Sequence, residues 1–98
     1  MHAHHFSVQR TAHFYTLGEP GLHTAECWLV LHGYGQLARY FLRRFDAVAD
    51  EHTLVAAPEA LSRYYTDQEG TRVGASWMTK EQRLADIEDN MAYLDALY

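Results

Sequence analysis

The sequence contains little that would hold it together covalently or anchor it to a membrane. Cys27 is the one cysteine in 98 residues, so no disulfide can form within the chain. The N-terminus lacks the basic region and apolar core of a secretory signal, and no apolar run approaches the roughly 20 residues that a membrane-spanning helix needs. Because Cys27 lies inside an apolar run, we expect a buried thiol in a reducing compartment, which favours the cytoplasm.

Positive charge is also scarce. The chain has 8 Lys and Arg against 13 Asp and Glu, a net charge of −5 with neutral histidines. This balance argues against nucleic acid or an anionic membrane as a partner. No repeat or linker divides the chain, and its length suits one small domain. Apolar residues make up 48% of it, so we expect a packed core.

Three histidines lie close together near the N-terminus, at His2, His4 and His5. Imidazole is a common metal ligand. No other residue nearby completes a coordination shell, so we expect a frayed terminus. The sequence predicts neither a bound metal nor a cofactor.

The most informative stretch is 26–36, which reads E-C-W-L-V-L-H-G-Y-G-Q. Its apolar run, 27–31, is typical of a strand buried on both faces of a parallel sheet. Gly33 and Gly35 then allow positive φ and close backbone approach before an amphipathic segment. Such a turn can aim N–H groups at the oxyanion of an ester intermediate. It can equally be a tight turn in which the glycines only fit the backbone, and H-G-x-G alone does not separate the two.

Other segments complete an α/β pattern. Alternation predicts an antiparallel edge strand over 6–17, and a second buried strand follows at 53–57 after a helix over 37–50. Strand, helix and strand then form one right-handed βαβ crossover. A second helix is predicted from a capping box of Thr79 and Gln82. Its apolar stripe comprises Leu84, Ile87, Met91, Leu94 and Tyr98.

The segment 58–79 is predicted to be a long ordered loop, because it carries aromatic residues among glycine and charged residues. Tyr64, Tyr65 and Trp77 could line an apolar acyl pocket. They could also pack locally beneath the loop, and packing is the slightly favoured interpretation.

Three motifs occur in order: W-L-V-L-H-G-Y-G-Q, L-V-A-A-P-E, and R-V-G-A-S-W-M-T-K-E ahead of a long helix. Together they resemble the phospholipase/carboxylesterase branch of the serine α/β hydrolases. The resemblance implies that 1–98 is an incomplete domain, the N-terminal portion of an α/β-hydrolase fold. It would have a mostly parallel sheet with an antiparallel N-terminal strand and two helices.

The resemblance also implies roles for individual residues. The backbone N–H of Tyr34 would be one oxyanion donor, with Gly33 and Gly35 setting the loop geometry. Gln36 and Trp77 would contact a small-molecule ester, and the chain would form part of the acyl pocket. His32 would brace the loop without being the catalytic histidine.

The catalytic serine, acid and histidine of that family are not found. Family members place the serine in G-F-S-Q-G on the strand after the last predicted helix, and the chain ends at Tyr98, before such a strand. The segment 74–78, G-A-S-W-M, lacks the closing glycine of G-x-S-x-G and precedes a helix without following a buried strand. We therefore expect Ser76 to be a loop or capping residue.

Two functions remain open. The favoured one is a carboxylic-ester hydrolase to which this chain supplies the oxyanion loop but no nucleophile, so that the chain alone is inactive. The alternative is a non-catalytic α/β module that binds a small ligand or a partner chain. Because the strand at 27–31 would lack a neighbour, self-association of the isolated chain is also predicted.

Overall fold

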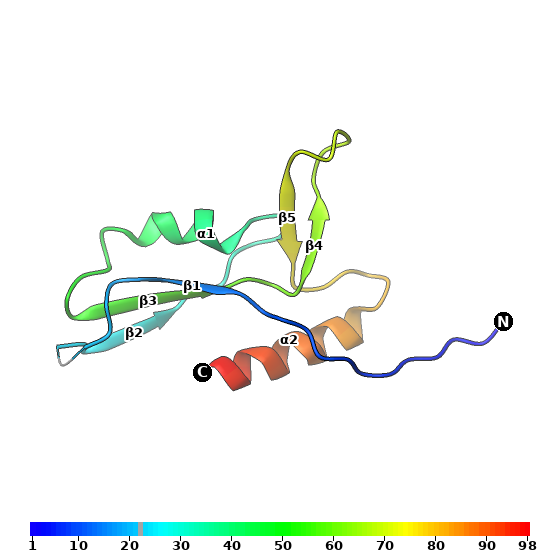
Figure 1. The fold of residues 1–98 in the computed structure, drawn as a ribbon, viewed down its shortest axis with the longest axis horizontal. Coiled ribbons are helices and arrows are strands. Elements are labelled where there is room, and N and C mark those ends of the chain that lie inside the picture. Colours follow the sequence, from blue (N-terminus) through cyan, green and yellow to red (C-terminus); the bar gives the residue numbers. More distant parts are fainter. Residues whose placement is uncertain (22) are drawn as a thin grey trace.

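The computed structural model describes residues 1–21 and 23–98. The chain is elongated, with principal extents of 57 × 32 × 18 Å (Figure 1). Its elements are β1 (Phe14–Leu17), β2 (Glu26–Leu29), α1 (Ala38–Phe41), the 3₁₀ turn η1 (Leu42–Phe45), β3 (Thr53–Pro58), β4 (Ser62–Tyr65), β5 (Val73–Ser76) and α2 (Arg83–Leu97).

A three-stranded sheet in the order β1-β3-β2 forms the centre. β1 pairs antiparallel with β3, placing Phe14 opposite Pro58, which agrees with the predicted antiparallel edge strand, although only its last four residues are paired. β2 pairs parallel with β3, placing Glu26 opposite Thr53. The helical segment α1–η1 connects these two parallel strands, as the predicted strand–helix–strand unit requires.

The second sheet overturns the predicted fold class. β4 and β5 form an antiparallel hairpin that stands beside α1, within the segment predicted to be a long loop (Figure 1). The five strands of the described residues thus lie in two mostly antiparallel sheets. The predicted fold class, a mostly parallel sheet belonging to an α/β-hydrolase fold, is therefore wrong. The hairpin forms because Asp67 closes its turn: the Asp67 carboxylate accepts the N–H groups of Thr71 (2.9 Å) and Arg72 (3.1 Å).

The core lies on one face of the central strand. Ala38 and Leu42 from the helical segment pack on Val55 and Ala57 of β3. β2, by contrast, is exposed along its whole length, and Cys27 is an exposed free thiol. The prediction of a strand buried on both faces, and with it a buried Cys27, is therefore wrong. β2 is an edge strand, and α1–η1 packs mainly on β3.

Helix α2 occupies the predicted region but starts later and presents a different face. It begins at Arg83 after Gln82, which makes no side-chain capping bond, so the capping box is wrong. Leu84, Met91 and Tyr98 of the predicted apolar stripe are exposed, Ile87 and Leu94 are half-buried, and Asn90 is the buried residue of the helix. Among the described residues no helix is both long and apolar enough to cross a bilayer.

Candidate functional site

The H-G-Y-G-Q segment forms a tight turn in which the side chain of Gln36 takes part. The Gln36 N–H donates to the Gly33 carbonyl at 3.2 Å, and Gly35 has φ +76°, as the third residue of a type II turn requires. The Gly33 N–H donates to Gln36 Oε1 at 2.6 Å. A Cβ on Gly33 would lie 3.0 Å from that oxygen, so a larger residue there would have to push the Gln36 amide aside.

Strand β5 holds the turn from one side. The Gly35 N–H donates to the Ala75 carbonyl at 2.9 Å, and the Ala75 N–H donates to the Gln36 carbonyl at 3.0 Å. The approach requires glycine at position 74, because a Cβ there would lie 2.5 Å from the Gly35 oxygen. The backbone of the turn is thus fixed by the hairpin that sequence patterns did not predict.

His32 holds the turn from the other side. Its side chain is 3% exposed, and Nε2 accepts the Ala60 N–H at 3.0 Å. Nε2 must then be unprotonated, so the proton is on Nδ1, which donates to the Gly33 carbonyl at 2.7 Å. Trp77 stacks on the imidazole with ring centroids 5.0 Å apart, and its indole N–H donates to the His32 carbonyl at 2.9 Å. His32 therefore braces the turn, as the resemblance implies.

One amide of the turn is left without an acceptor. The N–H groups of Gly33, Gly35 and Gln36 all have acceptors within the chain, whereas that of Tyr34 has none among residues 1–21 and 23–98. The free group is the one to which the resemblance assigns the oxyanion. The turn thus combines a rigid backbone with one available hydrogen-bond donor.

The Tyr34 side chain contributes differently from its amide. Its ring lies 5.5 Å from that of Tyr64, centroid to centroid, on β4 of the hairpin. The Tyr34 phenol, as hydrogen-bond partner, together with partial desolvation, raises the pKa of Tyr64 to about 12. The Tyr34 ring therefore packs against the hairpin, and the backbone N–H remains available.

Two residues expected to bind substrate also serve the turn. Gln36 uses its amide oxygen to hold Gly33, and Trp77 is half-buried against His32. Ser76 is the last residue of β5, so the expectation that it lies in a loop is wrong. It is 1% exposed, and its hydroxyl donates to the Met78 carbonyl at 2.5 Å, so within the described residues it hydrogen-bonds to no histidine. The described residues hold no group of three or more His, Cys, Asp or Glu arranged for a metal ion.

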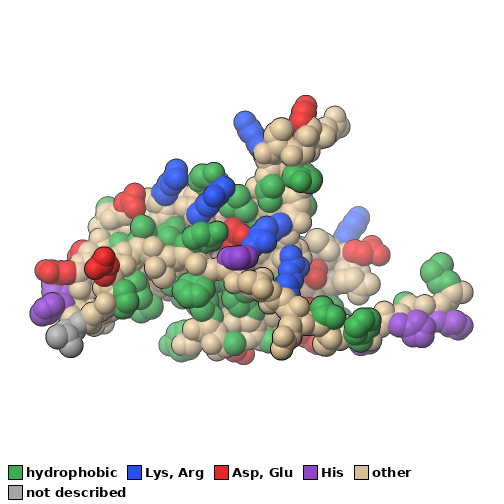
Figure 2. All heavy atoms as spheres, viewed as in Figure 1, with side chains coloured by type: hydrophobic (Ala, Val, Ile, Leu, Met, Phe, Trp, Pro, Cys, Tyr) green, Lys and Arg blue, Asp and Glu red, His purple; other side chains and the backbone are tan. Residues whose placement is uncertain are grey.

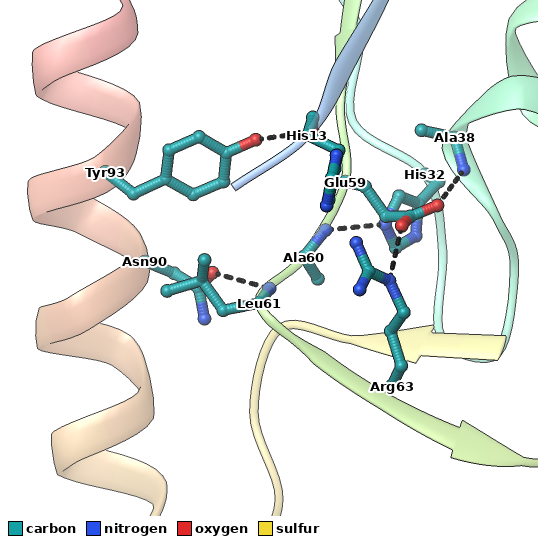
Figure 3. Close-up of polar contacts among 9 residues, drawn as sticks. All are labelled: His13, His32, Ala38, Glu59, Ala60, Leu61, Arg63, Asn90 and Tyr93. Atoms are coloured by element: carbon teal, nitrogen blue, oxygen red, sulfur yellow. Dashed lines mark hydrogen bonds and ion pairs between the residues drawn. The ribbon is translucent and has the colours of Figure 1, made fainter. Parts of the chain in front are cut away.

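The segment directly after β3 organises the site and was not predicted to do so (Figure 3). Glu59 is 5% exposed; one carboxylate oxygen accepts the Ala38 N–H at 3.2 Å and the other the Arg63 Nε–H at 2.7 Å. It therefore connects β3 with the start of α1 and with β4. The signal in the sequence was an acidic residue immediately after an apolar strand, in A-P-E.

Asn90 of α2 extends this network to the turn. Its amide oxygen accepts the Leu61 N–H at 3.3 Å (Figure 3). Its NH₂ group donates to the Trp77 carbonyl at 2.7 Å. Tyr93, one turn along the helix, donates to the His13 carbonyl at 3.0 Å. α2 thus supports Trp77, which in turn supports His32.

Comparison with known proteins adds no relatives: the chain matches no protein-family model and no curated protein sequence.

Proposed function

We propose that this chain supplies the oxyanion loop of a serine-dependent carboxylic-ester hydrolase resembling the phospholipase/carboxylesterase family, with a small-molecule ester as substrate. The observation that supports the proposal is the free N–H of Tyr34 in a turn whose neighbouring amides are all engaged. A turn that served only to reverse the chain would not need the bracing by His32 and Trp77.

The role of the Tyr34 N–H follows from the charge that develops on the ester during hydrolysis. When a nucleophile adds to an ester carbonyl, negative charge grows on the carbonyl oxygen, and a prepositioned N–H stabilises it without reorganising. The N–H of Tyr34 would donate to that oxygen. Gly33 and Gly35 would keep the peptide plane oriented, and Gln36 would hold the turn closed.

The nucleophile of this reaction has to come from outside the described residues. Neither Ser76 nor Cys27 contacts a histidine there, and the two hydrogen-bonding nitrogens of His32 are occupied by the Gly33 carbonyl and the Ala60 N–H. A second oxyanion donor would accompany the nucleophile. The proposed compartment is the cytoplasm, which a single exposed thiol favours because reducing conditions keep it free.

The test compares the isolated chain with the chain in its native context, meaning the whole polypeptide that contains it or its co-purifying partner. We expect the native form to hydrolyse p-nitrophenyl acetate or butyrate and the isolated chain to show no turnover above a heat-treated control. A native form without esterase activity would overturn the proposal. Turnover by the isolated chain that disappears in Ser76→Ala would show that the nucleophile lies in 74–78.

A further inference from the structure

A groove of about 540 Å³ lies between the α1–η1 segment and the β4–β5 hairpin, next to the turn. Arg39 and Arg44 line it from the helical segment, and Arg72 lines it from the hairpin. Figure 2 shows basic side chains over α1 and on the side of the hairpin that faces α1. In a chain of net charge −5, this is a local concentration of positive charge.

Within residues 1–21 and 23–98, these three guanidinium groups have no carboxylate partners. The ion pairs among the described residues join His52 to Glu51 and Arg63 to Glu59, and none involves Arg39, Arg44 or Arg72. Arg63, in a neighbouring hollow, shows the contrast, because the buried Glu59 carboxylate neutralises it at 2.7 Å.

Two further features favour a bound anion over a merely solvated basic surface. Arg39 lies over the Tyr40 ring at 4.8 Å and Arg44 over the Phe41 ring at 5.6 Å, which limits their freedom. The nearby Asp67 carboxylate is taken up by donors of the hairpin turn, from the Thr71 hydroxyl and backbone N–H groups, and these lower the pKa of Asp67. Asp67 is thus committed to the turn, and Glu69, the other acidic residue between β4 and β5, is exposed and does not line the groove.

We propose that this groove binds a small organic phosphate monoester. The planar fork of arginine matches the geometry of phosphate oxygens, and a monoester carries nearly two negative charges at neutral pH. Tyr40, Phe41 and Val73 also line the groove and provide an apolar wall for the organic part of the ligand. This proposal does not depend on ester hydrolysis, because it concerns the arginines and not the free N–H of Tyr34.

The experiment measures binding of phenyl phosphate, inorganic phosphate and benzoate to the full chain by equilibrium dialysis at constant ionic strength. The variants are Arg44→Gln and Arg72→Gln. Arg43→Gln is the matched control, because Arg43 neighbours Arg44 and lies over the Tyr40 ring at 5.1 Å but does not line the groove. Circular dichroism of each variant establishes that it is folded.

We expect phenyl phosphate to bind most tightly, inorganic phosphate more weakly because it lacks the ring, and benzoate most weakly because it carries a single charge. Arg44→Gln and Arg72→Gln should each weaken phenyl phosphate binding by about tenfold or more, as loss of a charge-assisted hydrogen bond implies. Arg43→Gln should change it less than twofold. Absence of binding, equal loss in all three variants, or benzoate binding as tightly as phenyl phosphate would overturn the proposal.

Discussion

At the scale of single residues, the backbone and the side chain of Tyr34 have separate roles. The amide is the free donor of the turn, and the phenol pairs with Tyr64 on the hairpin. The H-G-x-G motif could indicate the first role, because it marks the amide after its first glycine, that of Tyr34, as the candidate donor. It could not indicate the second, because the partner ring lies on a hairpin that the sequence patterns did not predict.

The tyrosine pair gives a prediction for alkaline pH. Tyr34→Phe should lower the pKa of Tyr64 from about 12 toward its ordinary value of 10.0, because the phenolic hydrogen-bond partner is removed. The raised pKa contributes stability that is fully present below pH 10 and is lost as pH rises toward 12, so the variant should lose less stability across that interval.

Phenolate absorbance follows the titration, with Tyr64→Phe identifying the Tyr64 contribution by difference. Tyr65→Phe, on the same strand with an exposed ring, is the control that should leave Tyr64 unchanged. An unaltered Tyr64 titration in Tyr34→Phe would contradict the pairing.

At the scale of elements, the local sequence pattern predicted where strands and helices lie better than it predicted which of their faces are buried. The strand predicted at 53–57 is found at Thr53–Pro58, and the helix predicted at 37–50 is found, shorter, as α1–η1. The hairpin was missed because its aromatic, charged and glycine residues resemble those of a loop. The face of α2 was predicted wrongly because the helix is held by polar contacts from Asn90 and Tyr93 to loop carbonyl and N–H groups, which a periodicity of apolar residues does not reveal.

The predicted apolar stripe of α2 and its observed polar contacts give opposite expectations for substitutions at two neighbouring positions, 90 and 91. Asn90→Leu should lower the free energy of unfolding by about 1–3 kcal/mol, because the part-buried Leu61 N–H and Trp77 carbonyl lose their partners. Met91→Ala should change it by less than about 0.5 kcal/mol, because Met91 is exposed. Urea denaturation measures both. A larger loss of stability in Met91→Ala than in Asn90→Leu would support the apolar stripe and would contradict the role given to the Asn90 hydrogen bonds.

At the scale of the whole molecule, the exposed edge of the central sheet is the feature that most favours self-association. β2 leaves its outer edge without a neighbouring strand in the part of the chain that the structure describes, and Trp28 and Leu29 are exposed on this strand. The core of the described residues comprises few large side chains, and Val55 is the largest residue that is fully buried. An exposed edge on a small core favours pairing with another chain.

We therefore expect the isolated chain to be marginally stable and to associate at micromolar concentration. Leu29→Lys should reduce association, because a lysine on an edge strand opposes edge-to-edge pairing. Light scattering and chemical denaturation test this together. A monodisperse monomer with a cooperative, reversible transition and a high midpoint would contradict it.

The central claim is that the backbone of the 32–36 turn, and not its side chains, stabilises an oxyanion. The most direct measurement is kcat for ester hydrolysis by the native form carrying either Gly33→Val or Tyr34→Phe. Gly33→Val should reduce kcat by about 10²–10³, the usual effect of losing one oxyanion donor, because a β-branched residue at 33 would push away Gln36 Oε1, 3.0 Å from the added Cβ, and distort the turn. Tyr34→Phe, which keeps the N–H, should leave kcat within a few-fold of the original. A benign Gly33→Val together with a large loss in Tyr34→Phe would contradict the claim.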